Sequence, residues 1–296
     1  MSVAPSIEPA AGTEVAPQRF AARHSPWWFL GPLSVIFVVC LLAPVFPVPS
    51  PNAQDLSHTS LPPVGFGGTW SHPLGTNDLG QDILSQLLWG GRLSFFIAIA
   101  GVVGAGLIGT TLGILGGFRR GASDLVITRL IDAQLALPFL LIAITMIAAR
   151  GQSLTVLVAV LSITGWATYA RVMRADTLTL RERQFTVALH AAGVPPRRIM
   201  TRHILPNSMS TLLVLCTLTF GQMIIAEGAL SFLGLGVTPP NISWGLMLAE
   251  GREFLQTTWW VEVCPGLAIL VVVLLANLAG DSLRAVYDPR KRGYGR

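Results

Sequence analysis

The chain has 296 residues, of which 52% are hydrophobic and 12% are charged, and its formal net charge is +5 at pH 7. A soluble protein of this length exposes far more charge, so the composition argues against a water-soluble protein and favours one that lies in a membrane.

Six runs without Asp, Glu, Lys or Arg approach or exceed the roughly 20 apolar residues that cross a bilayer. They are residues 27–46, 93–118, 133–149, 151–170, 204–226 and 263–280. The third and sixth runs are the shortest, so we expect their helices to borrow neighbouring turns that contain Asp132 and Asp281. An unpaired backbone group in lipid costs several kcal/mol, so each span should be a helix with its own hydrogen bonds. The prediction is an all-α polytopic membrane protein with six transmembrane helices.

The chain before the first run is rich in Ala and Pro and carries Glu8 and Glu14, so residues 1–25 are predicted to be a disordered cytoplasmic tail. The first run ends without a small-x-small cleavage site, which favours an uncleaved span over a signal peptide. Residues 26–296 then form the transmembrane domain, with predicted external loops at 47–92 and 228–262. Within the first loop, apolar residues recur at helical spacing over 82–91, which predicts an interfacial helix that leads into the second span.

The distribution of basic residues predicts the orientation, because short basic loops stay on the cytoplasmic side. With both termini inside, the cytoplasmic segments hold all of the 20 basic residues except Arg92, Arg150 and Arg252. Topology therefore explains the basic composition, and no nucleic-acid partner is needed to account for it.

Between the fourth and fifth spans lies a basic cytoplasmic loop, residues 170–206. Residues 176–192 lack Gly and Pro and predict a surface helix, which Gly193 would end in the left-handed conformation. Pro195 or Pro196 can begin a second helix that returns the chain to the membrane. The loop is thus predicted to be a helical elbow with a small, Ala-lined face for a partner protein. The alternative is a solvated basic loop that serves only topology.

No motif for chemistry is apparent in the chain. A P-loop ends in Lys followed by Ser or Thr, yet the only lysine is Lys291, which stands between two arginines. Zinc-protease and serine-hydrolase signatures are also missing. Cys40, Cys216 and Cys264 lie singly in predicted spans, as buried thiols do. We therefore expect a non-catalytic membrane subunit with no cofactor of its own.

Several ionisable residues remain as candidates for a solute pathway. Asp132 has either a structural role or a place on the translocation path, and Glu227 is the better candidate for lining an outer gate. His58 and His72 could bind a metal cargo, although ordinary polar roles are the more usual interpretation for two histidines in a turn-rich loop.

Two motifs resemble the inner-membrane permeases of binding-protein-dependent ABC importers, in the dipeptide/oligopeptide/nickel class and within it the dipeptide permease C-type subunits. The cytoplasmic loop resembles the EAA loop of that family through Val187, Ala188, Leu189, Gly193, Ile204, Leu205, Pro206 and Asn207. The second motif comprises Glu227, Leu230, Ser231, Phe232, Leu233, Gly234, Leu235, Gly236, Pro239, Pro240, Ser243, Trp244, Gly245, Met247, Leu248, Glu250, Gly251 and Arg252. Further matches before the second span and near the C-terminus extend the resemblance over roughly residues 26–292.

The resemblance implies the type I ABC importer permease fold and a coupling helix that docks on an ATPase through Glu182, Ala188, Ala191, Gly193, Leu205 and Pro206. Val187 stands where the EAA signature has its glutamate, so Glu182 would have to supply any negative charge. The implied partners are a second homologous permease, two ATPases that bind ATP and magnesium, and an extracytoplasmic substrate-binding protein. The implied location is the bacterial inner membrane.

Short peptides are the leading substrate class that the resemblance implies, and nickel or another small solute is the alternative. An ATP-independent carrier would need ionisable residues near the bilayer midplane, whereas the centres of these spans are uncharged.

Overall fold

The computed structural model describes residues 25–287, and this range is helical apart from its connecting segments and one isolated β-bridge between Thr76 and Asp82. The helices are α2 (Trp27–Leu41), α3 (Ile83–Arg119), α4 (Ala122–Ala136), α5 (Phe139–Arg150), α6 (Leu154–Arg181), α7 (Gln184–Ala191), α8 (Pro196–Ile199), α9 (Leu205–Asn207), α10 (Met209–Phe232), α11 (Trp244–Gly251) and α12 (Trp260–Tyr287). Short 3₁₀ turns cover Ala43–Val45 and Arg252–Phe254, and a π-helical turn covers Met200–Ile204.

All six predicted apolar runs fall on helices. Helices α3, α6, α10 and α12 are each long and apolar enough to cross a membrane, α4 and α5 together form a fifth, bent span, and α2 is a shorter apolar helix of 15 residues. The two short runs do borrow neighbouring turns, because α4 contains Asp132 and α12 contains Asp281. The predicted all-α architecture is confirmed.

The third span differs from the expectation of one continuous helix. Helices α4 and α5 meet at 92°, with the break at Leu137 and Pro138. Proline has no backbone N–H to donate and disfavours the helical conformation in the residue before it. Leu137 accordingly adopts an extended backbone with φ −84° and ψ 129°.

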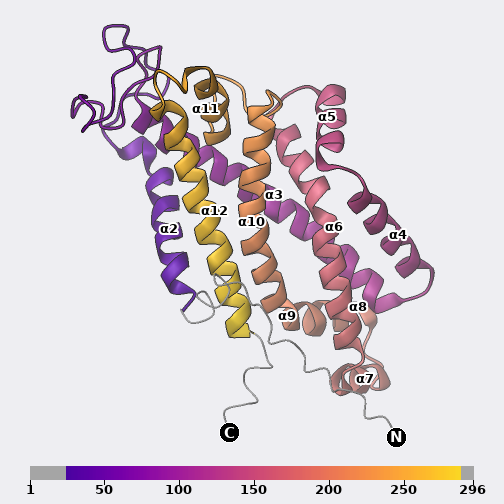
Figure 1. The fold of residues 1–296 in the computed structure, drawn as a ribbon. Coiled ribbons are helices and arrows are strands. Elements are labelled where there is room, and N and C mark those ends of the chain that lie inside the picture. The colour runs from indigo at the N-terminus through magenta and orange to yellow at the C-terminus, as the bar shows by residue number, and fades with distance from the viewer. Residues whose placement is uncertain (1–24, 288–296) are drawn as a thin grey trace, which may run out of the picture.

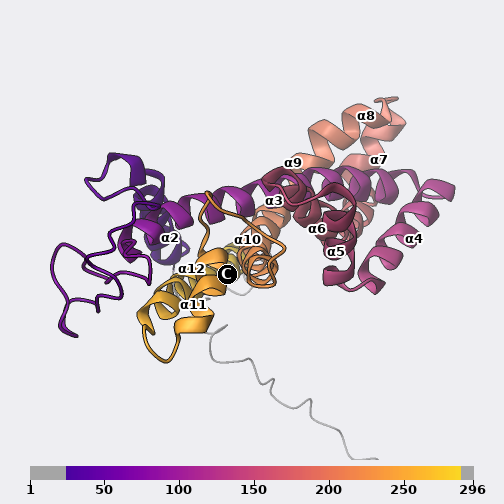
Figure 2. The same ribbon diagram turned by 90° about the horizontal axis from the view of Figure 1, so that it is seen from above.

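Helix α3 contains 37 residues, so it is about 55 Å long and exceeds the roughly 30 Å of a hydrocarbon core. It begins where Asp82 caps it, with the Ser85 backbone N–H donating to Asp82 Oδ2 at 2.8 Å. The interfacial helix predicted over 82–91 is therefore the first part of the membrane-spanning helix itself. Figures 1 and 2 show α3 running obliquely through the bundle, with α2 near its start and α4 near its end.

The two ends of the bundle differ in character. Figure 1 places α7, the start of α2 and the end of α12 at one end, with α11 and the segment before α3 at the other. Most of the arginines of residues 25–287 lie toward the α7 end, among them Arg183, Arg197 and Arg198, which are exposed. The positive-inside rule predicts that this end faces the cytoplasm.

A seam of small residues joins α3 to α6. Gly109, Gly113 and Gly117 lie four residues apart and face the backbone of α6, where a Cβ on Gly113 would lie 2.6 Å from the Ala170 carbonyl oxygen. A Cβ on Gly117 would likewise lie 2.7 Å from the Arg174 carbonyl oxygen. Small residues at this spacing let two helix backbones approach closely in a membrane, where packing drives helix association in place of the hydrophobic effect.

The cytoplasmic loop contains the elbow predicted for it, with one difference. Helix α6 continues to Arg181, and a separate short helix α7 follows at Gln184–Ala191, so the single helix predicted over 176–192 is wrong. Arg183 is extended at φ −69° and ψ 146°, and Thr186 Oγ1 donates to the Leu180 carbonyl at 2.8 Å across the corner. This side-chain hydrogen bond stabilises a corner that no Gly or Pro marks in the sequence.

The seam predicts the effect of one added methyl group. In Gly113→Ala the new Cβ overlaps the Ala170 carbonyl oxygen, so α3 and α6 must separate, at a cost of about 1 to 3 kcal/mol. The melting temperature of the purified protein in detergent should fall. The matched control is Gly31→Ala in α2, where a Cβ meets nothing within 4 Å. Equal melting temperatures for the two variants would contradict the close approach at the seam.

Candidate functional site

Helix α7 presents small and apolar side chains to the surrounding space. Val187 is 57% exposed, and Ala188, Ala191 and Gly193 are exposed beside it. The opposite face holds α7 in place, because Thr186 is buried and Leu189 packs into an apolar cluster with Ile199, Met200 and Ile204. A helix that is apolar on its outer face has a surface suited to a groove in another protein.

Gly193 ends α7 as predicted. Its φ is +72°, the left-handed region that glycine adopts without strain, and the Val194 N–H donates to the Leu189 carbonyl at 3.1 Å. Pro195 follows in an extended conformation, and α8 begins at Pro196, as the sequence predicted. Leu205 is partly buried and Pro206 exposed where the chain turns back into the membrane.

The base of α7 is tied to the end of α3. Arg120 forms an ion pair with Glu182, and the His190 ring stacks on Phe118 with centroids 6.3 Å apart. The Arg181 guanidinium lies over the same Phe118 ring at 5.7 Å. Glu182, the residue expected to offer negative charge to an ATPase, is thus bound to an arginine of its own chain.

A cavity of about 230 Å³ lies where the broken span meets α6 and α10. Its walls are apolar side chains, mainly of Leu, Ile, Phe and Met residues, together with polar, uncharged groups from three spans. The polar groups are Gln134 of α4, Thr164 and Thr168 of α6, and Thr219 and Gln222 of α10. Polar side chains inside a membrane protein are costly and are typical of a solute path.

Asp132 lies on α4 between its first turn and the break. Its Oδ1 accepts from Arg171 of α6 at 3.4 Å, and both side chains are more than half exposed. A second and closer pair joins the same helices nearer the α7 end, with Arg174 donating to both oxygens of Asp124 at 2.5 and 2.8 Å. These pairs fasten α4 to α6, and a translocation role for Asp132 stays a prediction.

Glu227 occupies the centre of a hydrogen-bonded cluster near the outer end of α10. Its carboxylate is fully buried and accepts from three serine hydroxyls, Ser231 and Ser243 at 2.8 Å and Ser94 at 3.2 Å. Each serine oxygen in turn accepts a backbone N–H, from Val237, Leu246 and Trp244 for Ser231, Ser243 and Ser94 respectively. The cluster therefore joins α3, α10, the segment before α11 and the first turn of α11.

Glu227 was predicted to line an outer gate, and its burial bears on this prediction. Its carboxylate has no exposed surface within residues 25–287, so in this structure it holds other elements in position and does not line an open path. Gly245 allows α11 to lie close to α10, because a Cβ on residue 245 would lie 2.7 Å from Gly228 Cα.

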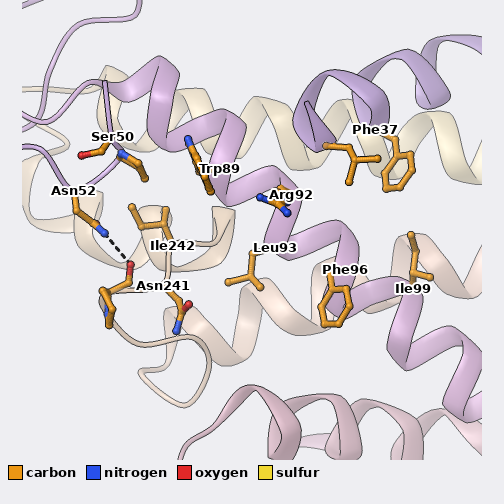
Figure 3. Close-up of a pocket in the computed structure, with 13 residues that line it drawn as sticks. Phe37, Ser50, Asn52, Trp89, Arg92, Leu93, Phe96, Ile99, Asn241 and Ile242 are labelled. Atoms are coloured by element: carbon orange, nitrogen blue, oxygen red, sulfur yellow. Dashed lines mark hydrogen bonds between the residues drawn. The ribbon is translucent and has the colours of Figure 1, made fainter. Parts of the chain in front are cut away.

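Two pockets open at the outer end of the bundle. The first has a volume of about 710 Å³ and lies between α2, α3 and the segment that precedes α11. Figure 3 shows apolar side chains such as Phe96 along this pocket, with Arg92 beside Trp89 and Asn52 donating to the Pro240 carbonyl at 3.0 Å. Its Trp and Arg are typical of a membrane interface.

The second outer pocket is larger, about 860 Å³, and more polar. It is lined by the carboxylates of Asp78, Glu250 and Glu253. Partial burial raises the pKa of Glu250, and the nearby Asp78 charge raises it further. The outer end of the bundle therefore presents an acidic pocket next to an amphipathic one.

The structure also places the two histidines considered for a metal. The His58 and His72 rings lie with centroids 6.0 Å apart, but His58 Nδ1 bonds Asp55 at 2.8 Å and His72 Nδ1 bonds Asp82 at 3.0 Å. Within the described part of the chain, no group of three or more His, Cys, Asp and Glu side chains is arranged to hold a metal ion. Hydrogen bonds from Ser57 and His58 lower the pKa of Asp55 to about 2.

The polar cavity was not predicted from the sequence. Its residues lie inside or beside runs that were defined by the absence of charge, and uncharged polar residues pass that criterion. The available signal was the presence of Gln134 and Gln222 among long apolar stretches, because Gln amides need partners in lipid.

These features define a multi-span helical membrane protein with a short exposed helix at one end and a polar cavity between its spans. Residues 109–293 match the family model of the binding-protein-dependent transport system inner membrane component. The chain belongs to this family.

Similar proteins support the assignment over most of the chain. The di/tripeptide transport system permease protein DppC of Pseudomonas aeruginosa is 40% identical over 258 residues, which cover 86% of this chain and 85% of that protein. The glutathione transport system permease protein GsiD of Pectobacterium atrosepticum is 36% identical, with coverage of 92% and 89%. The probable D,D-dipeptide transport system permease protein DdpC of Escherichia coli is 34% identical, with coverage of 93% and 94%.

A solved structure shares the fold. A chain of the MetNI methionine ABC transporter in an inward-facing conformation matches with a TM-score of 0.56 and 18% sequence identity, over 69% of this chain and 97% of that chain. The expected type I ABC importer permease fold is thereby confirmed, and the chain is a multi-pass inner-membrane transport subunit.

The serine cluster predicts how the outer end responds to loss of its acid. Glu227→Ala leaves three buried hydroxyl donors without their acceptor, at about 1 to 3 kcal/mol for each unsatisfied donor. We expect a melting temperature lower by about 5 °C or more and faster hydrogen exchange in α11. Glu253→Ala is the control, since Glu253 is exposed. If hydrogen exchange in α11 is as slow in Glu227→Ala as in Glu253→Ala, Glu227 does not hold this helix.

Proposed function

We propose that this chain is one of two permease subunits of an ATP-driven importer for di- and oligopeptides, with both termini in the cytoplasm. It forms half of the translocation pore together with a homologous permease. Two cytoplasmic ATPases carry out the phosphoryl transfer with ATP and magnesium, and an extracytoplasmic binding protein delivers the substrate. No catalytic step takes place in this chain, whose role is to bind, guide and couple.

The observation that carries this proposal is the form of the elbow. Helix α7 stands at the end of the bundle with an exposed outer face, and buried Thr186 and partly buried Leu189 hold it from behind. The relatives are named as peptide transport permeases, which favours peptides as the substrate.

The coupling contact would be apolar in this protein. Val187 occupies the position of the family's glutamate and is exposed, while Glu182 is paired with Arg120. Docking would then rest on Val187, Ala188 and Ala191 inserted in a groove, with Gly193 setting the direction of the chain.

The contacts at the base of α7 provide a route from the ATPase to the pore. A shift of α7 would act on the end of α3 through Phe118 and Arg120, and through the Asp124–Arg174 pair on α4. The other end of α4 is the break that borders the polar cavity. The broken span would switch between two positions, and the path would then open to one side of the membrane at a time. Asp132 and Arg171 would move together with this span. At the outer end, Glu227 would act on the gate by fixing α11.

A variant of the elbow tests the coupling role. Gly193→Asp places a side chain and a negative charge at a φ of +72° in the predicted docking surface, so it should abolish peptide uptake while ATP hydrolysis continues. Gly151→Asp, at the turn between α5 and α6, is the matched control, because its φ is +78° and an added Cβ there would meet no atom within 4 Å. Uptake and hydrolysis would be measured in proteoliposomes. Normal uptake by Gly193→Asp would refute the assignment of this loop.

The assembly itself is tested by purification from the native membrane in mild detergent. We expect the chain to bring down a second permease and ATPases, and di- or tripeptides with the binding protein should stimulate ATP hydrolysis. If peptides do not stimulate ATP hydrolysis by the complex, the proposed substrate becomes nickel or another small solute. A chain that purifies without any ATPase would refute the coupling proposal as a whole.

A further inference from the structure

We propose that the cavity at the break between α4 and α5 is a substrate subsite that binds the backbone amides of the passing peptide through Gln134 and Gln222. This inference rests on the proposed peptide-import function and names the part of the chain that contacts the cargo. The cavity has a volume of about 230 Å³ and receives walls from α4, α5, α6 and α10.

The side-chain amides of two glutamines in the cavity wall have no partner in the range 25–287. Gln134 of α4, which is half-buried, and Gln222 of α10, which is exposed, both line the cavity, and neither side-chain amide makes a hydrogen bond to any residue in that range. Each carboxamide has two N–H donors and a carbonyl acceptor. Polar groups at this depth need a partner in place of lipid, so their free donors and acceptors indicate a polar occupant of the cavity.

The remaining wall of the cavity is polar and uncharged. Thr164 donates its hydroxyl to the Val160 carbonyl of its own helix at 2.8 Å, so its oxygen keeps its acceptor capacity. Among the described residues, no charged side chain lines the cavity. A wall of donors and acceptors without charge fits a group that carries both an N–H and a C=O, as a peptide bond does.

The volume of the cavity limits what it can hold. Pockets that enclose small molecules usually measure about 300 to 1,000 Å³. A cavity of about 230 Å³ takes one or two peptide units and lacks room for a whole oligopeptide. The subsite is therefore this chain's half of a path whose other half is supplied by the second permease.

The site also explains how one path accepts many sequences. Contacts to backbone amides are the same for every peptide, while the exposed Leu135 and Leu137 offer apolar surface to side chains. Nickel would gain nothing from this wall, because Gln and Thr oxygens without carboxylate or imidazole are poor ligands for that metal.

The test uses the complete complex in proteoliposomes, with the purified binding protein and a radiolabelled tripeptide. Gln222→Leu and Gln134→Leu remove the amides at similar side-chain volume. We expect each to lower the kcat/KM of peptide transport by about three- to tenfold, the value of a single neutral hydrogen bond. The peptide-free ATPase rate and the yield of complex should not change. Gln256→Leu, on the exposed segment before α12, is the control.

Photocrosslinking identifies the occupant directly. A photoreactive amino acid at Gln222 should capture the labelled tripeptide during turnover, while the same group at exposed Leu274 of α12 should not. Capture of the second permease in place of peptide would overturn the inference, because the amides would then belong to a subunit interface.

The design separates failure of the subsite from failure of the proposed function. Peptide stimulation of the wild-type ATPase is measured first, and its absence would remove peptide import and the subsite together. Where stimulation is present but both leucine variants transport peptide normally, only the subsite is refuted. A fall in complex yield or in peptide-free ATPase rate would assign the two glutamines a structural role and likewise refute it.

Discussion

The close approach of α3 and α6 is the contact on which the rest of the structure depends. Gly109, Gly113 and Gly117 let the backbone of α3 lie against α6, so that α3 can be long and oblique and still be held. In lipid there is little hydrophobic drive to bring two apolar helices together, so the seam must come from packing of small residues. The other spans are arranged around this pair: α10 contacts α3 and α6, α12 packs on α10, and α4 lies against both partners of the seam.

The same pair also links the two functional ends. Beyond the seam α3 ends at Phe118 and Arg119, and α6 ends at Arg181. The side chains that hold α7 therefore lie together at these two helix ends. At its other end α3 carries Ser94 to the buried Glu227 carboxylate. In the proposed mechanism, the closely packed pair, which reaches from the elbow to the outer cluster, would serve as the body against which the broken span moves.

Much of this fold could be predicted from the sequence because its causes are local. Length and absence of charge marked the spans, and Gly193 and Pro196 marked the turn of the elbow. What could not be predicted depends on distant partners. The bonds of Glu227 join residues up to 133 positions apart, and Glu182 pairs with Arg120 across 62 positions. Pro138 was a visible signal for the break in the third span, but the 92° angle between α4 and α5 depends on how both helices pack on α6.

The positions of charge and polarity divide the molecule into two kinds of polar site. The one acid within the outer half of α10 is enclosed by serines and serves to join elements, whereas the groups that face the cavity are neutral amides and hydroxyls. A fixed charge in the wall would hold one terminus of a zwitterionic peptide strongly and repel the other, and release is as necessary to transport as binding. Enclosing Glu227 keeps its carboxyl group away from the cavity while its three hydrogen bonds still fix α11, so the outer end can be firm and the wall of the proposed subsite can remain weakly attractive.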